Sequence, residues 1–263
     1  MSHHLRRIVC LSAEAADWLY RLGAWERVAG VTAFFELPDG AERKLCVGGF
    51  SKGRVEDIAA LNPDLVITFS DVQAGITSEL MRRGIAVLGT NQRTLAEIES
   101  TLALLGKLVD REAEAARFLN EFRQKLAPVE NVTVRPRVYF EEWNEPLVAG
   151  ITWVSELIER AGGADIFAEL RSGKSASERE VAPEEVVRRN PEIILASWCG
   201  KPVRAMEIAS RPGWNKVSAV KQRMIREIAG ADILQPGYRL VFGYEEMKRR
   251  LREWRAESSV ISN

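Results

Sequence analysis

Histidine is almost absent from this chain: the sequence contains only His3 and His4, both at its start. No imidazole is therefore available elsewhere to act as a general base or a metal ligand. The sequence also lacks a G-x-S-x-G nucleophile elbow, and its glycine-rich run at 48–53 has the spacing of neither a P-loop nor a dinucleotide-binding fingerprint. Together these absences predict a protein that is not an enzyme.

Cysteine is also scarce, and Cys10, Cys46 and Cys199 do not have the spacing of a metal site. Cys10 and Cys199 lie in or beside predicted strands, where we expect small buried thiols. Cys199 follows a strand, as a nucleophile would, but no histidine is near to activate it. An enzyme or cofactor-maturation protein that uses Cys199 is therefore the less favoured alternative.

The sequence has no excess of either charge, because 37 basic residues balance 37 acidic ones. It has no basic stripe interleaved with aromatic residues, which argues against a nucleic-acid partner. No apolar run approaches the length of a membrane span, so we expect no membrane insertion. No apolar leader precedes the first predicted strand, which predicts a cytoplasmic protein; a periplasmic or envelope protein is the alternative if a signal segment has been removed. We further expect a monomer.

Acidic residues crowd one predicted loop, at Glu141, Glu142 and Glu145. Such carboxylates can bind a hard cation or form an acid–base pair. A solvated acidic rim is the simpler interpretation, because charged side chains are mostly exposed. We therefore predict neither a metal site nor a catalytic residue in this loop.

A helical span at 94–127 lies in the middle of the chain. Thr94 and Glu97 form a capping box at its start, and Pro128 marks its end. Apolar residues recur along it mostly three or four positions apart, which is the spacing of one buried helical face. We expect a break near Asp110, a good N-cap residue, followed by a rigid second half.

The segments on either side of this span repeat each other. Residues 55–68 and 183–196 each read as a short helix, an Asn-Pro stop followed by an acidic residue, and a buried strand. A strand followed by a helix lies upstream of both copies, so the order of elements is the same in each half.

This internal repeat predicts the architecture. We expect an α/β fold with two similar parallel-sheet lobes joined by a long central helical connection, and a ligand cleft between the lobes. The predicted boundaries are 1–93 for the N-terminal lobe, 94–127 for the connecting spine, and 128–263 for the C-terminal lobe with its terminal helix.

Aromatic residues follow the predicted strands of both halves. In open α/β sheets, ligands bind outside the carboxyl ends of the strands. The aromatic residues at these positions are Phe34, Phe50, Phe69, Trp143, Trp198 and Tyr238. As a set they predict a site for a large, flat, partly apolar ligand. For any one of them, packing within its own lobe is an equally good interpretation.

Several segments resemble the class III substrate-binding proteins, the helix-spined receptors for vitamin B12, ferric siderophores and haem that serve ABC transporters. The segments that carry this resemblance are Arg7-Ile-Val-Cys-Leu-Ser, Val47-Gly-Gly-Phe-Ser, Ala60-Leu-Asn-Pro-Asp-Leu-Val, Gly162-Gly-Ala-Asp-Ile-Phe and Arg189-Asn-Pro-Glu-Ile-Ile. Other segments are similar to the cobalamin-binding branch, namely Phe140-Glu-Glu-Trp-Asn-Glu-Pro-Leu, Trp153-Val-Ser-Glu-Leu-Ile-Glu, Ser197-Trp-Cys-Gly-Lys and Arg211-Pro-Gly-Trp.

The resemblance implies non-enzymatic binding of cobalamin or a related corrinoid, with cobalamin as ligand and no covalently bound cofactor. Phe69 matches a receptor tryptophan position, Trp214 lies near another, and Leu147 lies near a receptor phenylalanine. Trp153, Gln235 and the backbone of Gly49 complete the expected ligand-binding residues. An ABC permease is the partner that the resemblance implies, but Lys216 lies about where transporter-bound relatives carry a docking glutamate, which argues against docking.

Uptake of haem or a ferric siderophore is the other function that the resemblance implies. In that case Tyr238 or the acidic loop at 141–145 would lie near iron, and Arg239 would meet anionic groups of the ligand.

Overall fold

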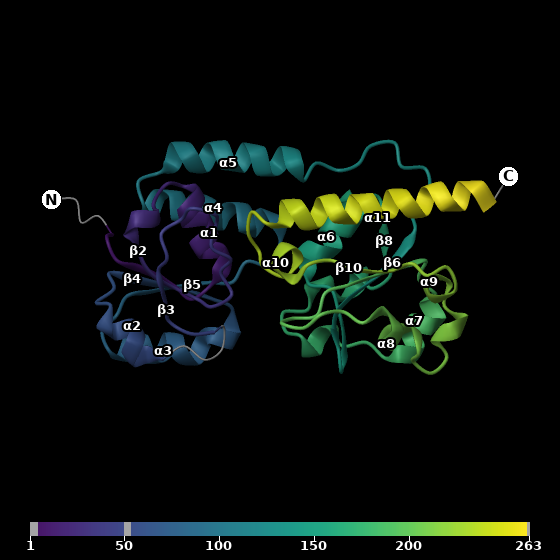
Figure 1. Cartoon of the computed structure of the whole chain (residues 1–263), viewed down its shortest axis with the longest axis horizontal. Helices are drawn as coiled ribbons and strands as arrows, with labels where there is room; N and C mark the ends of the chain where they lie inside the picture. The colour runs from purple at the N-terminus through teal and green to yellow at the C-terminus, as the bar shows by residue number, and fades with distance from the viewer. Residues whose placement is uncertain (1–4, 50–53, 262–263) are drawn as a thin grey trace. The chain divides into compact units, whose positions relative to one another are not determined.

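The computed structural model describes residues 5–49 and 54–261, with side chains up to Glu257, and the chain falls into two compact units, 1–122 and 123–263 (Figure 1). Each unit contains one twisted sheet with helices on both of its faces. Within the described residues, no helix is both long and apolar enough to cross a membrane.

The sheet of unit 1 has the strand order β3-β2-β1-β4-β5, and every pairing in it is parallel. Its strands are β1 (Ile8–Cys10), β2 (Val28–Val31), β3 (Leu45–Cys46), β4 (Leu65–Phe69) and β5 (Val87–Thr90). The central strands β1 and β4 are buried along their whole length, as expected for a parallel sheet covered on both faces.

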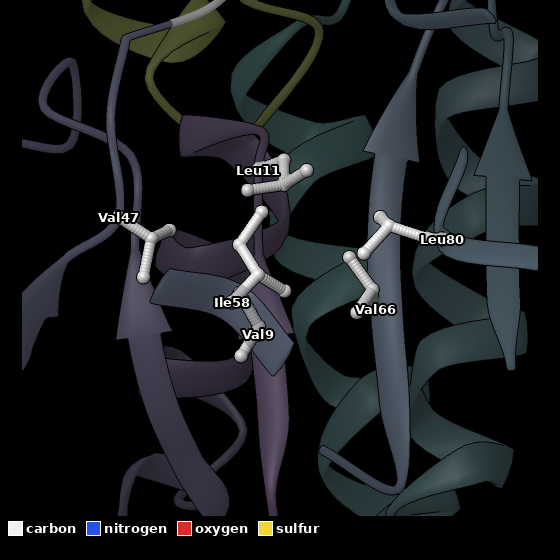
Figure 2. Close-up of a cluster of buried hydrophobic side chains, with 6 residues drawn as sticks. All are labelled: Val9, Leu11, Val47, Ile58, Val66 and Leu80. Carbon is white, nitrogen blue, oxygen red and sulfur yellow. The ribbon is translucent and has the colours of Figure 1, made fainter. Parts of the chain in front are cut away.

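Helices cover both faces of this sheet (Figure 1). They are α1 (Ala13–Arg21), α2 (Val55–Ala60), α3 (Ala74–Arg82) and the short turns η1 (Trp25–Arg27) and η2 (Asp71–Gln73). Ile58 of α2 and Leu80 of α3 pack against Val9 and Val66 of the two central strands, in the cluster that Figure 2 shows. On the other face, Trp18 of α1 meets Phe122 edge to face, with ring centroids 5.9 Å apart.

The expected break in the central helical span is confirmed. The span consists of α4 (Leu95–Leu108) and α5 (Glu112–Lys125), and the predicted capping box at the start of α4 is present. Asp110 interrupts the helix with a φ of 54°, which is left-handed backbone. Gly106 allows the turn to close, because a Cβ there would lie 2.5 Å from the Cβ of Ala115. The spine is therefore two helices, not one continuous rod.

The sheet of unit 2 has the order β10-β9-β6-β7, and β8 also pairs with β6. Its strands are β6 (Arg137–Asn144), β7 (Leu147–Ala149), β8 (Ala164–Asp165), β9 (Ile193–Ala196) and β10 (Ile225–Glu227). The second sheet is parallel as expected except at one strand, because β7 runs antiparallel to β6. The sequence signal for β7 is weak, since the strand has only three residues and follows β6 after a two-residue turn.

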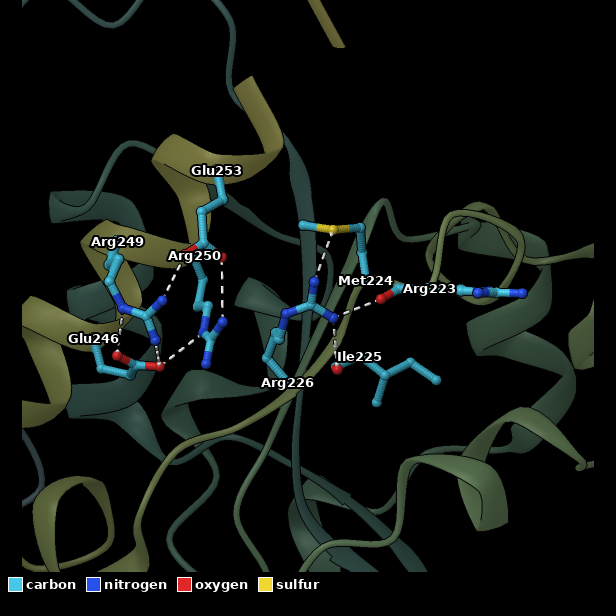
Figure 3. A network of polar contacts seen from close by, with 8 residues as sticks. All are labelled: Arg223, Met224, Ile225, Arg226, Glu246, Arg249, Arg250 and Glu253. Carbon is cyan, nitrogen blue, oxygen red and sulfur yellow. Dashed lines mark hydrogen bonds and ion pairs between the residues drawn. The ribbon is translucent and has the colours of Figure 1, made fainter. Parts of the chain in front are cut away.

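The helices of unit 2 surround this sheet. They are α6 (Thr152–Arg160), α7 (Pro183–Arg189), α8 (Ala205–Ala209), α9 (Ser218–Lys221), α10 (Gly230–Ile233), α11 (Leu240–Ile261) and the turns η3 (Ala168–Ser172), η4 (Ser177–Arg179) and η5 (Trp214–Lys216). Helix α11 is the terminal helix expected for the C-terminal lobe. Glu246 pairs with Arg249 and Arg250 on its surface, and Arg249 and Arg250 also pair with Glu253 (Figure 3). Such pairs stabilise an exposed helix face.

The internal repeat is confirmed down to individual hydrogen bonds. Asn62 and Asn190 end their helices with φ values of 45° and 48°. The acidic residue two positions later then accepts a hydrogen bond from the main chain at the start of the central strand. In unit 1, Asp64 accepts from the backbone N–H of Arg7 at 2.9 Å. In unit 2, Glu192 accepts from the backbone N–H of Arg137, also at 2.9 Å.

We predict that truncating Ile58 destabilises unit 1. The Ile58→Ala variant should lower the free energy of unfolding by about 2–5 kcal/mol, because the fully buried side chain leaves a cavity between α2 and the sheet. Urea denaturation measures this change. The matched control is Met81→Ala on α3, whose side chain is 63% exposed and whose loss should cost less than about 0.5 kcal/mol. Equal effects of the two substitutions would contradict the assignment of the core.

Candidate functional site

A buried ion pair lies at the carboxyl end of the central strands of unit 2. Glu141 of β6 is fully buried and receives two hydrogen bonds from the guanidinium of Arg211, at 2.5 and 2.9 Å. The indole Nε1 of Trp198, just after β9, donates to the same carboxylate at 3.0 Å. The paired geometry offsets the cost of burying the charge. The expectation of a solvated acidic rim is therefore wrong for Glu141.

The neighbouring carboxylate is also paired. Glu142 accepts hydrogen bonds from both terminal nitrogens of Arg179, at 2.6 and 3.0 Å, and from the backbone N–H of Ile151 at 3.1 Å. Arg179, whose side chain is only 2% exposed, also donates to the carbonyl of Ala149 at 2.5 Å. Both carboxylates of this strand thus hold arginines in place, and neither is left free to act as an acid or base.

Near these ion pairs, one lysine lies against two indole rings. The Nζ of Lys201 is 4.1 Å from the ring centroid of Trp143 and 5.1 Å from that of Trp198. We call these three residues the Trp–Lys cluster. The Nζ of Lys201 also donates to the side-chain oxygen of Asn144 at 2.6 Å, and the Nδ2 of Asn144 donates to Glu207 at 2.7 Å. The cluster combines aromatic surface, a cation and an amide, which suits a flat ligand that carries polar groups.

The other predicted site residues of unit 2 are more deeply buried. Trp153 lies inside the unit, where its Nε1 donates to the carbonyl of Ile233 at 2.8 Å. Trp214 has no exposed surface, and its ring packs against Tyr139 and under the guanidinium of Arg211, 4.6 Å from the ring centroid. In this structure both indoles support the unit from within.

Three further predicted residues of unit 2 lie in β7 and in the segment before α11. Leu147 is buried in β7, and Gln235 is partly exposed in the segment before α11. Tyr238 is 6% exposed and meets Phe242 edge to face, with centroids 6.2 Å apart.

In unit 1 the predicted residues gather at the carboxyl edge of the sheet. Phe34, after β2, is 47% exposed, and its ring lies 3.6 Å from the position that a Cβ on Gly49 would occupy. Phe69 is the last residue of β4 and is 8% exposed. Phe50 lies outside the described residues. Phe34 and Gly49 are thus brought together, and Phe34 offers the larger exposed aromatic surface.

Sequence reasoning missed a buried glutamine that links two strand ends in unit 1. The Oε1 of Gln73 accepts from the backbone N–H of Phe69, and its Nε2 donates to the carbonyl of Leu11, both at 2.9 Å. Ser70, which lies between Phe69 and Gln73 in the sequence, has a positive φ of 63°. Nothing in the local pattern of the sequence distinguishes this glutamine from an exposed one, because its partners come from two separate strands.

Burial disfavours the charged forms of two titratable groups near β1. Burial raises the pKa of Glu14 to about 7, partly opposed by hydrogen bonds from its own backbone and from Ser12. Burial, and secondarily the charge of Glu14, raises the pKa of the Cys10 thiol. These shifts follow from loss of water around the charged form.

The structure gives no support to a nucleophilic Cys199. This residue is exposed, which corrects the expectation of a buried thiol. The pKa of its thiol is nevertheless raised, first by partial burial of the sulfur and then by the charge of Glu142. A reactive cysteine needs a lowered pKa. Among the residues that the structure describes, no group of three histidine, cysteine or acidic side chains is placed to hold a metal ion.

The sequence matches one protein family and several known proteins. A family described as periplasmic binding protein has a sequence model that matches residues 8–230. A cobalamin-binding protein of Halobacterium salinarum is 29% identical over 198 residues, which are 72% of this chain and 53% of that protein, so the chain spans about half the length of this relative. A vitamin B12-binding protein of Vibrio parahaemolyticus is 26% identical over 199 residues, which are 73% of this chain and 71% of the relative.

A solved structure agrees with the α/β class. A periplasmic haem-binding protein from Roseiflexus sp. RS-1 matches with a TM-score of 0.80 and 19% identity, covering 95% of this chain and 99% of the other. At this identity the likeness concerns the fold alone. The predicted class of two lobes with predominantly parallel sheets is confirmed.

We predict that removing the charge of Glu141 destabilises unit 2. The Glu141→Gln variant should lose about 3 kcal/mol of unfolding free energy, because Arg211 is left largely buried without a counter-charge. Chemical denaturation checks this value. The double variant Glu141→Gln/Arg211→Met should recover most of the loss, whereas Glu145→Gln, at an exposed position, should change little. A double variant no more stable than the single one would contradict the role of the pair.

We also predict a pH-dependent contribution from Glu14. Its folded pKa of about 7 lies above the ordinary value of 4.5, so the folded state binds the proton more tightly than the unfolded state. The contribution is full below pH 4.5 and is lost as the pH rises through 7, by about 3 kcal/mol in total. Unfolding free energies of the wild type and of Glu14→Gln, measured from pH 4 to pH 8, give this difference. A constant difference across that range would refute the assignment.

Proposed function

The chain belongs to the periplasmic binding protein family, and on this premise we propose that it binds cobalamin or a related corrinoid without transforming it. The resemblance to class III substrate-binding proteins is confirmed by the family match. The names of the relatives from Halobacterium salinarum and Vibrio parahaemolyticus support the corrinoid as ligand. Proteins of this family bind solutes, which agrees with a function that is not enzymatic.

The Trp–Lys cluster is the observation that carries the proposal. A corrin is a large, flat ring whose edge bears amide groups, so it needs an aromatic surface and hydrogen-bonding groups around it. Trp143 is partly exposed, and it contributes the aromatic surface. Lys201 and Asn144 lie beside it as a donor and an amide that can exchange their mutual hydrogen bond for bonds to the ligand.

The buried residues beneath the cluster keep it in place. Trp198 is fixed by its bond to Glu141, and Glu141 is fixed by Arg211. A site held in this way loses less conformational entropy when the ligand binds. In unit 1 we assign ligand contact to Phe34, Phe69 and Gly49. The cleft between the lobes stays a prediction, as do contacts of the ligand with the remaining predicted residues.

Haem or a ferric siderophore is the second candidate ligand, favoured by the fold shared with the Roseiflexus protein. The residues proposed for it are less suitable. Tyr238 is buried, and Arg239 is paired with Asp232 at 2.7 Å, so its charge is already balanced. We therefore rank the corrinoid first.

We infer the cellular location and the partner of this protein from its family. The expectation of a cytoplasmic protein has no support in the comparisons, and the Roseiflexus relative is periplasmic. We therefore propose a place in the cell envelope, with an ABC permease as the partner. Lys216 is exposed in η5, and its effect on docking stays a prediction.

Titration with cyanocobalamin, haem and a ferric siderophore in parallel tests the ligand. We expect saturable binding of cyanocobalamin, followed by tryptophan fluorescence and calorimetry. Trp143→Ala should weaken it by about tenfold, because a stacking surface is lost. The control Leu104→Ala removes an equally apolar side chain, 41% exposed on α4, and should leave the affinity unchanged.

A second variant separates the two ligand classes. Lys201→Gln keeps a hydrogen-bonding group but removes the charge. It should leave cobalamin binding within about twofold and weaken the binding of haem, whose carboxylates need a cation. Haem binding without cobalamin binding would overturn the proposal, and a response to neither compound nor to the siderophore would overturn both candidates.

A further inference from the structure

A basic groove lies at the opposite edge of the unit 1 sheet from the proposed corrinoid contacts. Its cavity volume is about 310 Å³, and its lining includes Arg6, Arg7, Arg43 and Lys44 together with Glu26 and Glu42. Arg7, Arg27 and Lys44 immediately precede the strands β1, β2 and β3. Because these strands are adjacent and parallel, their amino ends meet at one edge, and the groove forms there.

The acidic side chains of the groove are already paired. Glu42 pairs with Lys44, with Nζ and Oε2 2.8 Å apart, and Glu26 lies 3.7 Å from the Nε of Arg27. Asp64, at the same edge, accepts the backbone N–H groups of Arg6 and Arg7. These two hydrogen bonds lower the pKa of Asp64, which keeps it ionised as a main-chain acceptor. None of the three carboxylates is paired with the guanidinium of Arg6 or Arg43.

Two arginines of the groove are therefore uncommitted. Within the described parts of the chain, neither Arg6 nor Arg43 has an ion pair or a side-chain hydrogen bond, and both are exposed. The whole chain has a formal net charge of zero, so this local excess of cations does not come from a generally basic protein. Uncommitted guanidinium groups around one hollow form an electrostatic site for an anion.

The backbone that presents these arginines is fixed. Asp64 holds the main chain of Arg6 and Arg7, as described for the internal repeat. On the other side of the groove, the indole of Trp25 donates to the carbonyl of Glu42 at 3.0 Å, which anchors the segment carrying Arg43. The Nζ of Lys44 also lies 5.6 Å from the centroid of the Trp25 ring. The groove is thus preformed on both sides, and a ligand would only have to order two side chains.

We propose that this groove binds a small oligophosphate, the pyrophosphate group or a longer phosphate chain of a free small molecule. Guanidinium groups match pairs of phosphate oxygens through two parallel N–H donors, and two such groups suit a ligand with at least two phosphoryl groups. The volume is near the lower end of the range for small-molecule sites, and the lining is mainly charged. Both features favour a compact polyanion over an apolar or flat ligand. The proposal is independent of the corrinoid site.

Calorimetric titration of the full chain with pyrophosphate, at low ionic strength and without magnesium, tests the proposal. We expect saturable binding that weakens as salt is added. Arg6→Gln and Arg43→Gln should each weaken it by about tenfold, because each removes a charge-assisted contact. Arg43→Lys should have a smaller effect, because it keeps the charge but loses the two-pronged geometry.

Three controls make the result specific. Arg82→Gln, on α3 in the same unit, removes an exposed arginine that is paired with Glu79, and it should bind pyrophosphate like the wild type. Thermal melting of each variant reports whether it is folded. Cyanocobalamin binding of Arg6→Gln/Arg43→Gln should equal that of the wild type, so failure at one site is distinguished from failure at the other.

The outcomes that overturn the proposal are specific as well. They are the absence of pyrophosphate binding by the wild type, an equal loss in Arg82→Gln, or full binding by the folded double variant. Binding of citrate in place of pyrophosphate would also overturn it, because a carboxylate ligand would then be the one recognised.

Discussion

The hydrogen bonds that Asp64 and Glu192 accept from the main chain at the starts of the central strands set the register on which both units depend. Each carboxylate follows an Asn-Pro helix stop and accepts the main-chain N–H at the start of β1 or β6. The side chain of the same arginine then donates to a carbonyl at the end of the preceding helix. The Nε of Arg7 donates to Leu61, and the Nε of Arg137 donates to Asn190. These bonds join the end of the preceding helix, the start of the central strand and the start of the strand beside it. Since a parallel strand displaced by one residue turns its buried side chains to the other face, this anchor fixes what each carboxyl edge presents.

Most of the fold could be predicted from the sequence because its signals are local. The Asn-Pro stops, the buried strands after them and the capping box at Thr94 each depend on neighbours within a few residues. The hairpin of β6 and β7 was missed for the opposite reason. Its outer strand has three residues, and the charged residues Glu141 and Glu142 read as a loop until their partners are known.

The packing around the candidate site follows less directly from the sequence than the fold does, and the reason is sequence separation. Trp198 follows β9 as expected, whereas Trp143 lies within β6, and the rings of both residues lie near the Nζ of Lys201. The ion pair that supports them joins positions 70 residues apart, and the bond from Lys201 to Asn144 spans 57. No local pattern reports such partners. A tryptophan expected at the site can also be fully buried, as Trp214 of η5 is beneath the guanidinium of Arg211.

The repeat makes the two units alike in fold but unlike in charge. The residue before the anchored arginine is Arg6 in unit 1 and Pro136 in unit 2, so the second copy has no cation at that position. The nearest arginine in unit 2, Arg135, donates to the carbonyl of Glu159. The anchor itself needs only the main-chain N–H and the acidic residue, which both copies retain. Arg6 and Arg43 are therefore not explained by the fold of unit 1, and an anion bound in the groove would lie near both guanidinium groups.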